Sequence, residues 1–360
     1  MKISIVVPNW NGMEFVGMCL DSLSQLDFEG HEVIVVDNGS KDGSREMIEN
    51  KYPWVRLLKL SKNMGFAIAC NEGIKASKAE YIVLLNNDIE VTPNWLKELY
   101  EGMERHPECG MGTTKMMFLD NRDVFYNTGD LFHSWSSGGG RGQGEKDIGQ
   151  YEEEDYIFGA CAGAGIYRRE FFKQVGLFDE DFFIFAEDVD LNMRGQLKGL
   201  KAVYLPKAKV YHIGTATVGL YSDRYVYLCK RNDIWVLIKN YSLSMYFKYL
   251  VTIWKHQFTD IKYFTYRGQG QVLFKSKWDV LKMLPQMLCR RYRIQIERST
   301  PDEHIEKLII SDEQEIVMVM RGKPNNYLSL PISFRGFLLA LHKICVIANP
   351  LNLSAKLFFL

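Results

Sequence analysis

The chain has 360 residues, with 44 Lys and Arg against 44 Asp and Glu and 47% hydrophobic residues, which is ordinary for a globular protein. Its seven cysteines stand singly, with no C-x-x-C pair. This pattern argues against a disulfide framework or a zinc site, and it fits a reducing cytoplasm. No run reaches the roughly 18 uninterrupted apolar residues that a membrane-spanning helix needs.

The first hundred residues alternate between strand-like and helix-like patterns. The apolar run at 3–7 is interrupted by Pro8, so we interpret it as a first strand and not as a signal peptide. The other predicted elements in this part are strands at 32–37, 55–60 and 80–85 and helices at 14–26, 43–50, 65–76 and 93–105. Such alternation is typical of an α/β protein whose parallel sheet is covered by helices on both faces.

Each of these four strands ends in polar residues. The polar tips are Pro8-Asn9, Asp37-Asn38, Ser61-Lys62-Asn63 and Asn86-Asn87-Asp88. Parallel strands place their carboxyl ends at one edge of a sheet, and such sheets bind ligands at that edge. We therefore expect the tips to converge on one site, although Asn and Asp also favour ordinary turns.

The remainder of the chain is less regular and then becomes helical. The predicted features are a Gly-rich loop at 134–147, a run of small residues at 158–167, a helix at 168–175, an acidic and aromatic stretch at 178–191, strands at 203–206 and 209–212, a basic helical region up to 296, a strand at 315–320 and a helix at 334–347. We place a domain boundary at about residue 220, which gives a region 1–220 and a mainly helical region 221–360.

The two commonest glycine-rich phosphate loops are missing. No G-x-G-x-x-G follows the first strand, and G-x-x-x-x-G-K-[ST] does not occur. A diphosphate must then be held in another way, and Mg²⁺ or Mn²⁺ bound by a carboxylate is the obvious candidate. Asp88 at a strand mouth suits this role, and Asn86 can offer an oxygen to the cation or to a ribose hydroxyl.

Six stretches together resemble family 2 glycosyltransferases of the inverting GT-A kind, and most of all the rhamnosyltransferase-like members that build bacterial surface polysaccharides. The stretches are IVVPNWNG (5–12), VIVVDNGSKDGS (33–44), NMGFAIACNEGI (63–74), LLNNDIEV (84–91), FGACAGAGIYRREFFKQVGLFDEDFFIFAEDVDLNMR (158–194) and VYHIGTATVG (210–219). Their order and spacing carry the resemblance, since each stretch alone is a weak signal.

The resemblance implies a GT-A fold, a Rossmann-like mixed sheet with helices on both faces, followed by the helical C-terminal region. It divides the first region into a nucleotide-sugar-binding half at 1–110 and an acceptor-binding half at 111–220. The implied activity is transfer of a sugar, with inversion, from dTDP-rhamnose or a UDP-hexose to a saccharide hydroxyl.

The resemblance also implies which residues bind the nucleotide-sugar. The loop after the first strand would grip the base, and Asp37 would read the pyrimidine or ribose. Arg231 is our candidate for the residue that stabilises the leaving diphosphate. The full set of expected contacts is Pro8, Asn9, Asn11, Asp37, Asn38, Asn63, Gly65, Asn71, Asn86, Asn87 and Arg231.

LLNNDI corresponds to the Asp-x-Asp metal motif of the family but has Asn86 in place of the first acid. Binding of Mn²⁺ or Mg²⁺ should therefore depend more on Asp88 and on a further ligand, for which His212 is our candidate. Imidazole suits Mn²⁺ better than Mg²⁺. The alternative is a histidine that is satisfied inside a turn.

The acid pair of the family corresponds to Glu187 and Asp188, and Asp188 is the expected base for the acceptor hydroxyl. A helix start at this point would lower a carboxylate pKa, whereas a neighbouring acid would raise it. The alternative is a charged first turn of a helix without a catalytic role.

Residues 224–298 contain 15 Lys and Arg against 4 Asp and Glu, mixed with aromatic residues. Such segments bind anionic membrane surfaces, and no nucleic-acid-binding motif is present. The resemblance implies an acceptor on polyprenyl diphosphate, so we expect a cytoplasmic enzyme that is peripheral on the inner face of the plasma membrane.

Other roles stay open at this point. For the basic region, the alternative to membrane binding is that its helices pack on the rest of the protein or form a homodimer contact. For the whole chain, a nucleotidylyltransferase and a non-catalytic sugar- or partner-binding protein are the competing classes.

Overall fold

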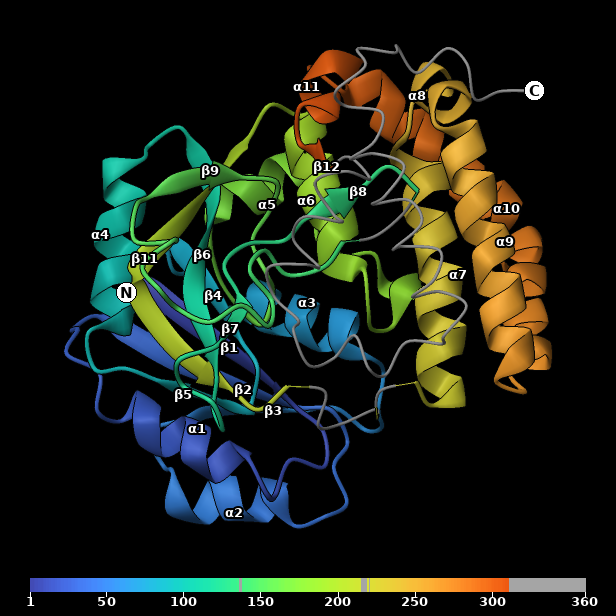
Figure 1. Cartoon of the computed structure of the whole chain (residues 1–360). Helices are drawn as coiled ribbons and strands as arrows, with labels where there is room; N and C mark the ends of the chain where they lie inside the picture. Colours follow the sequence, from blue (N-terminus) through green and yellow to red (C-terminus); the bar gives the residue numbers. More distant parts are fainter. Residues whose placement is uncertain (136–137, 215–218, 220, 311–360) are drawn as a thin grey trace.

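A computed structural model describes residues 1–135, 138–214, 219 and 221–310 of the chain (Figure 1). A twisted sheet lies at the centre of the first part, and a group of long helices stands beside it. The predicted strand at 315–320 and helix at 334–347 lie outside the described residues. Among the described helices, none combines the length and the apolar character needed to cross a membrane.

The first hundred residues form the predicted elements, with ends within three residues of the expected ones. They are β1 (Ile3–Asn9), α1 (Val16–Leu23), β2 (His31–Asp37), α2 (Ser44–Lys51), β3 (Arg56–Lys59), α3 (Phe66–Ala76), β4 (Tyr81–Leu85) and α4 (Trp95–Arg105), with an unpredicted short strand β5 (Ile89–Val91). The continuous β-branched runs thus became buried strands, as expected for a sheet covered on both faces.

The middle of the chain adds short strands and two helices. They are β6 (Cys109–Phe118), β7 (Phe125–Asn127), β8 (Phe132–His133), β9 (Asp155–Ile157), β10 (Ala164–Arg168), α5 (Arg169–Val175), a 3₁₀ helix η1 (Glu180–Phe182), α6 (Glu187–Leu197) and β11 (Lys201–His212). The prediction of two short strands at 203–206 and 209–212 was wrong, because these residues belong to the single strand β11. Its register shifts between Leu205 and Lys209, and Pro206 in this interval has no N–H to donate.

The sheet is mixed, in the order β3-β2-β1-β4-β10-β6-β11-β5, with β7 beside β6 and β9 beside β11. Strands β1 to β4 are parallel to one another, whereas β10 runs antiparallel to both β4 and β6. The parallel order brings the carboxyl ends of β1, β2 and β4 to one edge, and β11 ends at the nearby β5.

Both faces of the sheet are covered. One buried cluster joins Ile5 and Val7 of β1 to α1, α2 and α4. The alternate residue Val6 belongs to the other cluster, with α3, α5 and Leu191 of α6. Successive side chains of a strand point to opposite faces, so β1 contributes to both cores.

The C-terminal region is mainly helical, as expected. It contains α7 (Asp223–Asn240), α8 (Leu243–Lys248), α9 (Leu250–Tyr266), α10 (Gly270–Glu297), α11 (Asp302–Glu306) and β12 (Ile309–Ile310), which pairs with β8. Val189 and Met193 of α6 share a buried cluster with Trp235 and Val236 of α7. The helices therefore pack directly on the segment that contains the expected catalytic acids.

Candidate functional site

The polar ends of β1, β2 and β4 lie together and are joined by hydrogen bonds. The Asn9 side-chain amide donates to Ser44 Oγ at 3.1 Å, to Ser40 Oγ at 3.3 Å and to the Asp37 carboxylate at 3.4 Å. Asn87 Nδ2 in turn donates to Asn9 Oδ1 at 2.8 Å. The strand tips thus converge as the sequence predicts.

The loops after β1 and β2 support each other. Asn11 has a left-handed φ of 49°, and its Oδ1 accepts from the Lys41 N–H at 2.9 Å. Asp37 is fully buried, and its Oδ2 accepts from the Ser40 N–H at 3.3 Å. Both Asp37 oxygens therefore face protein donors, while Pro8 is buried within β1. Direct contact of these residues with a base stays a prediction.

Because Gly12 has no side chain, Asn9 and Asn87 can form their hydrogen bond beside it. A Cβ at Gly12 would lie 2.2 Å from Asn87 Nδ2 and 2.3 Å from Asn9 Oδ1. Real Cβ atoms do not approach other atoms so closely, so either side chain would have to move. Glycine at this position is therefore tied to the Asn9–Asn87 hydrogen bond.

We expect Gly12→Ala to weaken nucleotide-sugar binding about 10-fold, the equivalent of one hydrogen bond, while the fold stays intact. The matched control is Gly17→Ala in α1, where the new Cβ would lie 3.6 Å from Tyr52 Oη in ordinary contact. Calorimetric titration with the donor compares the two variants. Equal affinities would show that the Asn9–Asn87 contact does not support the donor site.

Asn38 ties the end of β2 to the loop before α3. Its Nδ2 donates to Asn63 Oδ1 at 3.2 Å and to the Gly65 carbonyl at 3.0 Å, and its Oδ1 accepts from the Met64 N–H at 2.8 Å. Gly65 has a φ of +98°, and a Cβ there would lie 2.7 Å from the Phe183 carbonyl oxygen. Gly65 thus lets α3 start against the segment that leads to α6.

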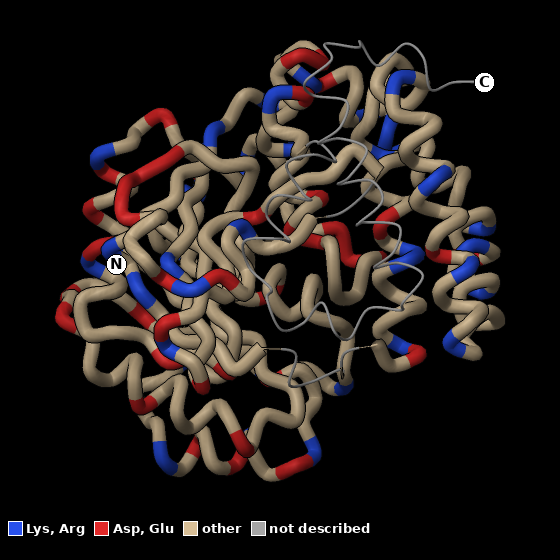
Figure 2. Tube along the Cα trace, viewed as in Figure 1, with Lys and Arg blue, Asp and Glu red and all other residues tan. Residues whose placement is uncertain are grey.

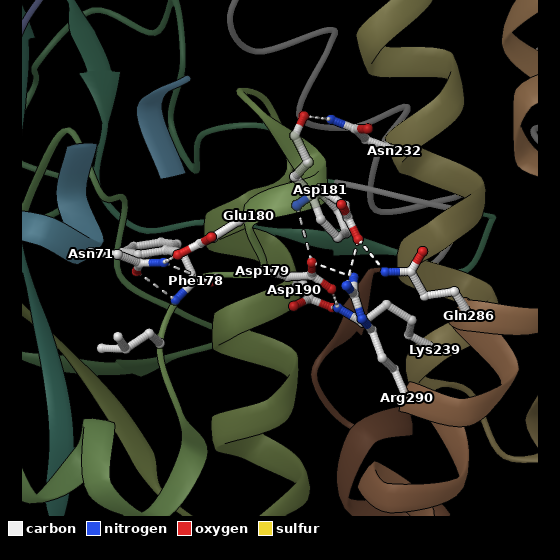
Figure 3. Close-up of polar contacts among 12 residues, drawn as sticks. Asn71, Phe178, Asp179, Glu180, Asp181, Asp190, Asn232, Lys239, Gln286 and Arg290 are labelled. Carbon is white, nitrogen blue, oxygen red and sulfur yellow. Dashed lines mark hydrogen bonds and ion pairs between the residues drawn. The ribbon is translucent and has the colours of Figure 1, made fainter. Parts of the chain in front are cut away.

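The structure does not bring Asn71 to the strand tips. This buried side chain on α3 donates to the Phe178 carbonyl and accepts from the Phe178 N–H, both at 3.0 Å, and also donates to Glu180 Oε1 at 3.1 Å (Figure 3). Its hydrogen-bonding groups are therefore used to hold the 178–180 segment to the sheet. The expected nucleotide contact of Asn71 is not supported by this placement.

Asp88 and His212 are in direct contact although 124 positions separate them. His212 Nε2 lies 3.0 Å from Asp88 Oδ1, and both side chains are buried. Because β11 pairs with β5, the last residue of β11 is aligned with Ile89, beside Asp88. Nearby, the Asn86 N–H donates to the Gly163 carbonyl at 2.8 Å, which anchors the end of β4.

The donor set around Asp88 fits a hard divalent cation. Ligands at adjacent corners of an octahedron with bonds of about 2.1 Å lie about 3.0 Å apart, as the Asp88 and His212 atoms do. Among the described residues, His212 Nδ1 and Asn86 Oδ1 are buried without a hydrogen-bond partner. Buried polar atoms without partners are rare, and Asn86 Oδ1 leaves capacity for a ligand here, whereas His212 Nδ1 is the ring nitrogen that does not face Asp88.

A second polar cluster contains Asp188, Asp130 and Cys161. One ligand atom from each lies within 4.8 Å of the other two. The Tyr126 ring meets the His212 imidazole edge-on, with the ring centroids 4.3 Å apart. Burial raises the pKa of the Tyr126 hydroxyl, and so do the charges of Cys161, Asp88, Asp130 and Asp188. Tyr126 is therefore close to Asp88 and to the cluster. The expected base is therefore close to the Asp88–His212 pair.

Sequence reasoning missed Tyr126 and Asp130. The sequence did contain a signal for Asp130, because this residue closely follows the short strand β7, as the polar residues at the other strand tips follow their strands. Asp130 is held by Asn127 Nδ2 at 3.2 Å and by Asn192 Nδ2 at 3.0 Å. A three-residue strand in an irregular region gives too little periodicity to be recognised.

Three carboxyl groups lie near one another here: Glu187 and Asp130 are buried, and Asp188 is half-buried. Burial raises the pKa of Asp188, and the N–H groups of Val189 and Ala162 oppose this rise. The pKa values of Glu187 and Asp130 are raised well above normal, first by burial and then by the Asp188 charge. An ionised Asp188 therefore favours the protonated form of both neighbours.

The helix start that the sequence predicts is present, since α6 begins at Glu187. Burial nevertheless outweighs the backbone N–H groups around Asp188, and the pKa of Asp188 is raised. Glu187 Oε2 has no hydrogen-bond partner among the described residues. A carboxylate whose pKa lies above its normal value is a stronger proton acceptor, as general base catalysis requires.

Asp190, the third acid of this stretch, has a structural role. It lies between Arg194 Nε at 2.9 Å and Lys239 Nζ at 2.8 Å, and Asn240 Nδ2 donates to it at 2.9 Å. Burial acts to raise the pKa of Asp190, but Lys239 and Arg194 outweigh it and lower this pKa to about 2. Asp190 thus binds α6 to α7.

Further ion pairs fasten the segment before Asp188 to the C-terminal helices (Figure 3). Lys239 of α7 and Arg290 of α10 both pair with Asp179, and Arg290 also pairs with Asp181. Gln286 adds a hydrogen bond to Asp181 at 2.9 Å. The segment 179–190 is therefore clamped between the sheet and two helices of the C-terminal region.

The clamped segment has a strained backbone. Phe183, Phe185 and Ala186 have φ values of 68°, 73° and 60°, which are unfavourable for residues with a Cβ. Asn232 of α7, fully buried, donates to the carbonyl groups of Phe182, Ile184 and Phe185 at 2.7 to 3.0 Å. Asn232 thus holds the turn that delivers Asp188.

Arg231 takes part in the same clamp. Its Nη2 donates to the carbonyls of Asp181 and Phe182, both at 2.9 Å, and its guanidinium lies over the Trp235 ring at 4.1 Å. Among the described contacts, none joins Arg231 to the strand tips or to the Asp88–His212 pair. The structure therefore does not support its expected contact with the leaving diphosphate.

We expect Asn232→Ala to lower the free energy of unfolding by about 2–4 kcal/mol, because three carbonyls of a strained turn lose their shared donor. Turnover should fall as well, since the turn positions Asp188. Urea denaturation and steady-state kinetics measure the two effects, with the exposed Asn121→Ala as control. An Asn232→Ala variant as stable and as active as the Asn121→Ala control would contradict the clamp.

Comparison with known proteins agrees with this geometry. Residues 4–176 match the family model described as Glycosyl transferase family 2. The N-acetylglucosaminyl-diphospho-decaprenol L-rhamnosyltransferase of Mycobacterium tuberculosis is 26% identical over 257 residues, 60% of this chain and 80% of that protein. The poly-beta-1,6-N-acetyl-D-glucosamine synthase of Staphylococcus epidermidis is 24% identical over 256 residues, 68% of this chain and 59% of that protein.

Two solved structures share the fold. TarS 1–349 of S. aureus in complex with UDP-GlcNAc has a TM-score of 0.53 at 20% identity, over 90% of this chain and 88% of that chain. GalNAc-T7 with UDP, GalNAc and Mn²⁺ has a TM-score of 0.55 at 16% identity, over 66% of this chain and 48% of that chain. The fold is thus GT-A-like, with a helical C-terminal region, and residues 4–176, just under half of the chain, match glycosyl transferase family 2.

Proposed function

We propose that this protein is an inverting, metal-dependent glycosyltransferase that moves a sugar from a nucleotide-sugar to a saccharide hydroxyl. The observation that carries the proposal is the contact of Asp88 with His212, together with the Asp130–Cys161–Asp188 cluster, both of which lie near Tyr126. A cation-binding pair next to a carboxylate with a raised pKa is the arrangement that this reaction needs. The family match supports it.

In this proposal Asp88 and His212 hold Mn²⁺ or Mg²⁺, and Asn86 offers its unpartnered oxygen to the cation or the ribose. The ion supplies neutralisation of the negative charge on the departing diphosphate. Nitrogen from an imidazole favours Mn²⁺ over Mg²⁺. The solved relative GalNAc-T7 contains UDP and Mn²⁺, which agrees with a cation of this kind.

The chain's own residues then perform the transfer. The acceptor oxygen forms a bond to the anomeric carbon as the bond from that carbon to the diphosphate oxygen breaks, which inverts the centre. Asp188, whose pKa is raised by burial, takes the proton of the acceptor hydroxyl. Burial and the Asp188 charge raise the pKa of Glu187, which favours the protonated form that can donate a hydrogen bond.

The nucleotide occupies the edge formed by the strand tips. Asn9, Asn38 and Asn87 hold the loops in one arrangement, and the Asn11 and Asn63 loops border them. Residues 1–110 thus form the nucleotide-sugar half and 111–220 the acceptor half, with 221–360 as the helical region. Asp37 and Pro8 act in our proposal by shaping this edge.

We further propose dTDP-rhamnose or a UDP-hexose as donor and a saccharide on polyprenyl diphosphate as acceptor, in surface polysaccharide synthesis. The rhamnosyltransferase relative is named for a decaprenol-diphosphate-linked acceptor, which supports this choice. A lipid-linked acceptor would place the enzyme on the inner face of the plasma membrane, in contact with the cytoplasm.

The experiment is a nucleotide-release assay with a panel of nucleotide-sugars, with and without Mn²⁺ and acceptor. A glycosyltransferase releases nucleoside diphosphate in a metal-dependent manner, faster with acceptor. A nucleotidylyltransferase would instead release pyrophosphate from a nucleoside triphosphate and a sugar phosphate, and a binding protein would release neither. Either of these outcomes would overturn the proposal.

A further inference from the structure

The outer faces of α8, α9 and α10 carry a continuous series of exposed apolar side chains. On α9, Trp254 is 65% and Phe258 60% exposed, and their neighbours follow at intervals of three or four residues, so they share one face. The exposed apolar residues of these three helices are Leu243, Phe247, Val251, Trp254, Phe258, Ile261, Tyr266, Phe274, Trp278, Leu281, Leu288, Tyr292 and Ile296. We call this surface the outer face.

The packing of the helices does not need the outer face. Ile253 and Phe264 of α9 and Val280 and Met287 of α10 are buried, and these residues bind the helices to their neighbours. In Figure 1, α9 and α10 stand at the edge of the molecule, beyond α7. An apolar series of this length on an exposed side of a protein marks an interaction site.

The same three helices also carry many Lys and Arg residues (Figure 2). The exposed cations of α8–α10 and the turn after α9 are Lys248, Lys255, Lys262, Arg267, Lys275, Lys282 and Arg293. Within α8–α10, all of whose residues the structure describes, Glu297 is the only exposed acid, since Asp260 is buried and Asp279 half-buried. The partner must therefore accept apolar side chains and carry negative charge.

An anionic lipid bilayer meets both conditions. Apolar and aromatic side chains of surface helices enter the boundary of head groups and acyl chains, while Lys and Arg contact the anionic head groups. A protein partner fits less well, because lysine is depleted at protein interfaces. Single-stranded nucleic acid also fits less well, because Val251, Ile261 and Leu281 offer no aromatic ring on which a base can stack.

We infer that the outer face of α8–α10 lies on the surface of an anionic membrane. This inference stands on the exposed side chains alone, and it deepens the proposed function by placing the acceptor's membrane against a defined part of the chain. Trp254 and Trp278 enter the bilayer boundary, and the lysines beside them bind the phosphate groups of the lipids.

The first test is co-sedimentation of the full chain with vesicles of equal parts phosphatidylglycerol and phosphatidylcholine. The variant Trp254→Ser/Trp278→Ser should bind about ten-fold or more weakly, because the burial of two large apolar side chains is lost. Trp54→Ser is the matched control: Trp54 is 45% exposed but lies between α2 and β3, and its loss should leave binding unchanged. Equal binding of the double variant and the control would overturn the inference.

The second test concerns charge. Lys255→Gln/Lys262→Gln/Lys275→Gln should weaken vesicle binding on the order of 100-fold, and salt should weaken the wild type in the same direction. The control neutralises three exposed lysines of the sheet region, Lys78→Gln/Lys97→Gln/Lys207→Gln, and should bind as the wild type does. Binding to pure phosphatidylcholine as strong as to the anionic vesicles would contradict the charge requirement.

Two further measurements separate this inference from its competitors. If sedimentation velocity shows wild-type dimers that Trp254→Ser/Trp278→Ser converts to monomers, a second copy occupies the outer face and the inference is wrong. Sugar transfer to a water-soluble acceptor should be unchanged in both membrane variants. Because vesicle binding is measured without donor, a failure of the proposed sugar transfer would leave the membrane result intact, and the converse also holds.

Discussion

Replacing Asp188 with asparagine should lower the turnover number by about 10² to 10⁴-fold, the usual contribution of a general base. Asparagine has the same shape but accepts no proton from the acceptor hydroxyl. The donor dissociation constant should stay within a few-fold of wild type, because in our proposal Asp188 acts on the acceptor and not on the nucleotide. Steady-state kinetics and donor titration measure the two quantities on one preparation.

Glu187→Gln is the matched comparison for this variant. Burial and the Asp188 charge raise the pKa of Glu187 well above normal, so glutamine replaces a carboxyl group whose protonated form is favoured. We therefore expect turnover to change by less than about 10-fold. A large loss in Glu187→Gln with little loss in Asp188→Asn would reverse the assignment of the base.

Asp88→Asn and His212→Ala should each weaken Mn²⁺-dependent donor binding by about 100-fold or more. Groups that only orient a metal ligand already contribute 10- to 100-fold to affinity. Titration with donor in the presence of Mn²⁺, and again with a chelator, isolates the metal-dependent part. In the chelated protein the variants and the wild type should bind the donor equally weakly.

The control for these variants is Asp123→Asn, which removes an acid that is half-exposed near β7 and contacts only Lys146 among the described ion pairs. It should bind donor and Mn²⁺ as the wild type does. Donor binding that is metal-dependent in the wild type and unchanged in both Asp88→Asn and His212→Ala would place the cation elsewhere. The Asp130–Cys161–Asp188 cluster would then be the next candidate.

Much of the fold could be predicted from sequence because each of the first strands is a continuous apolar run that stops in polar residues. That pattern fixes where a strand ends, and the parallel order of β1, β2 and β4 brings the ends together. The contacts of Asn87 with Asn9 and of His212 with Asp88 follow from this convergence. The second of them depended on the family resemblance, since the residues are far apart in the chain.

The acceptor side was harder to predict for a physical reason. The left-handed turn at Phe183, Phe185 and Ala186 leaves carbonyls that need donors, and aromatic or alanine residues give no sequence signal for such a backbone. Arg231 and Asn71 supply hydrogen bonds to this segment, so polar residues that we expected to face a ligand face the protein. The domain division and the roles of the site residues stay predictions.

The central claim is that the strand tips assemble around a cation beside Asp188. The most direct measurement is anomalous diffraction at the manganese edge from crystals grown with Mn²⁺ and a nucleoside diphosphate. We predict one peak at about 2.0–2.2 Å from Asp88 and His212, with a diphosphate oxygen in contact. A peak bound by Asp130 and Asp188 with Asp88 still paired to His212, or a nucleotide bound away from Asn9 and Asn87, would contradict the account.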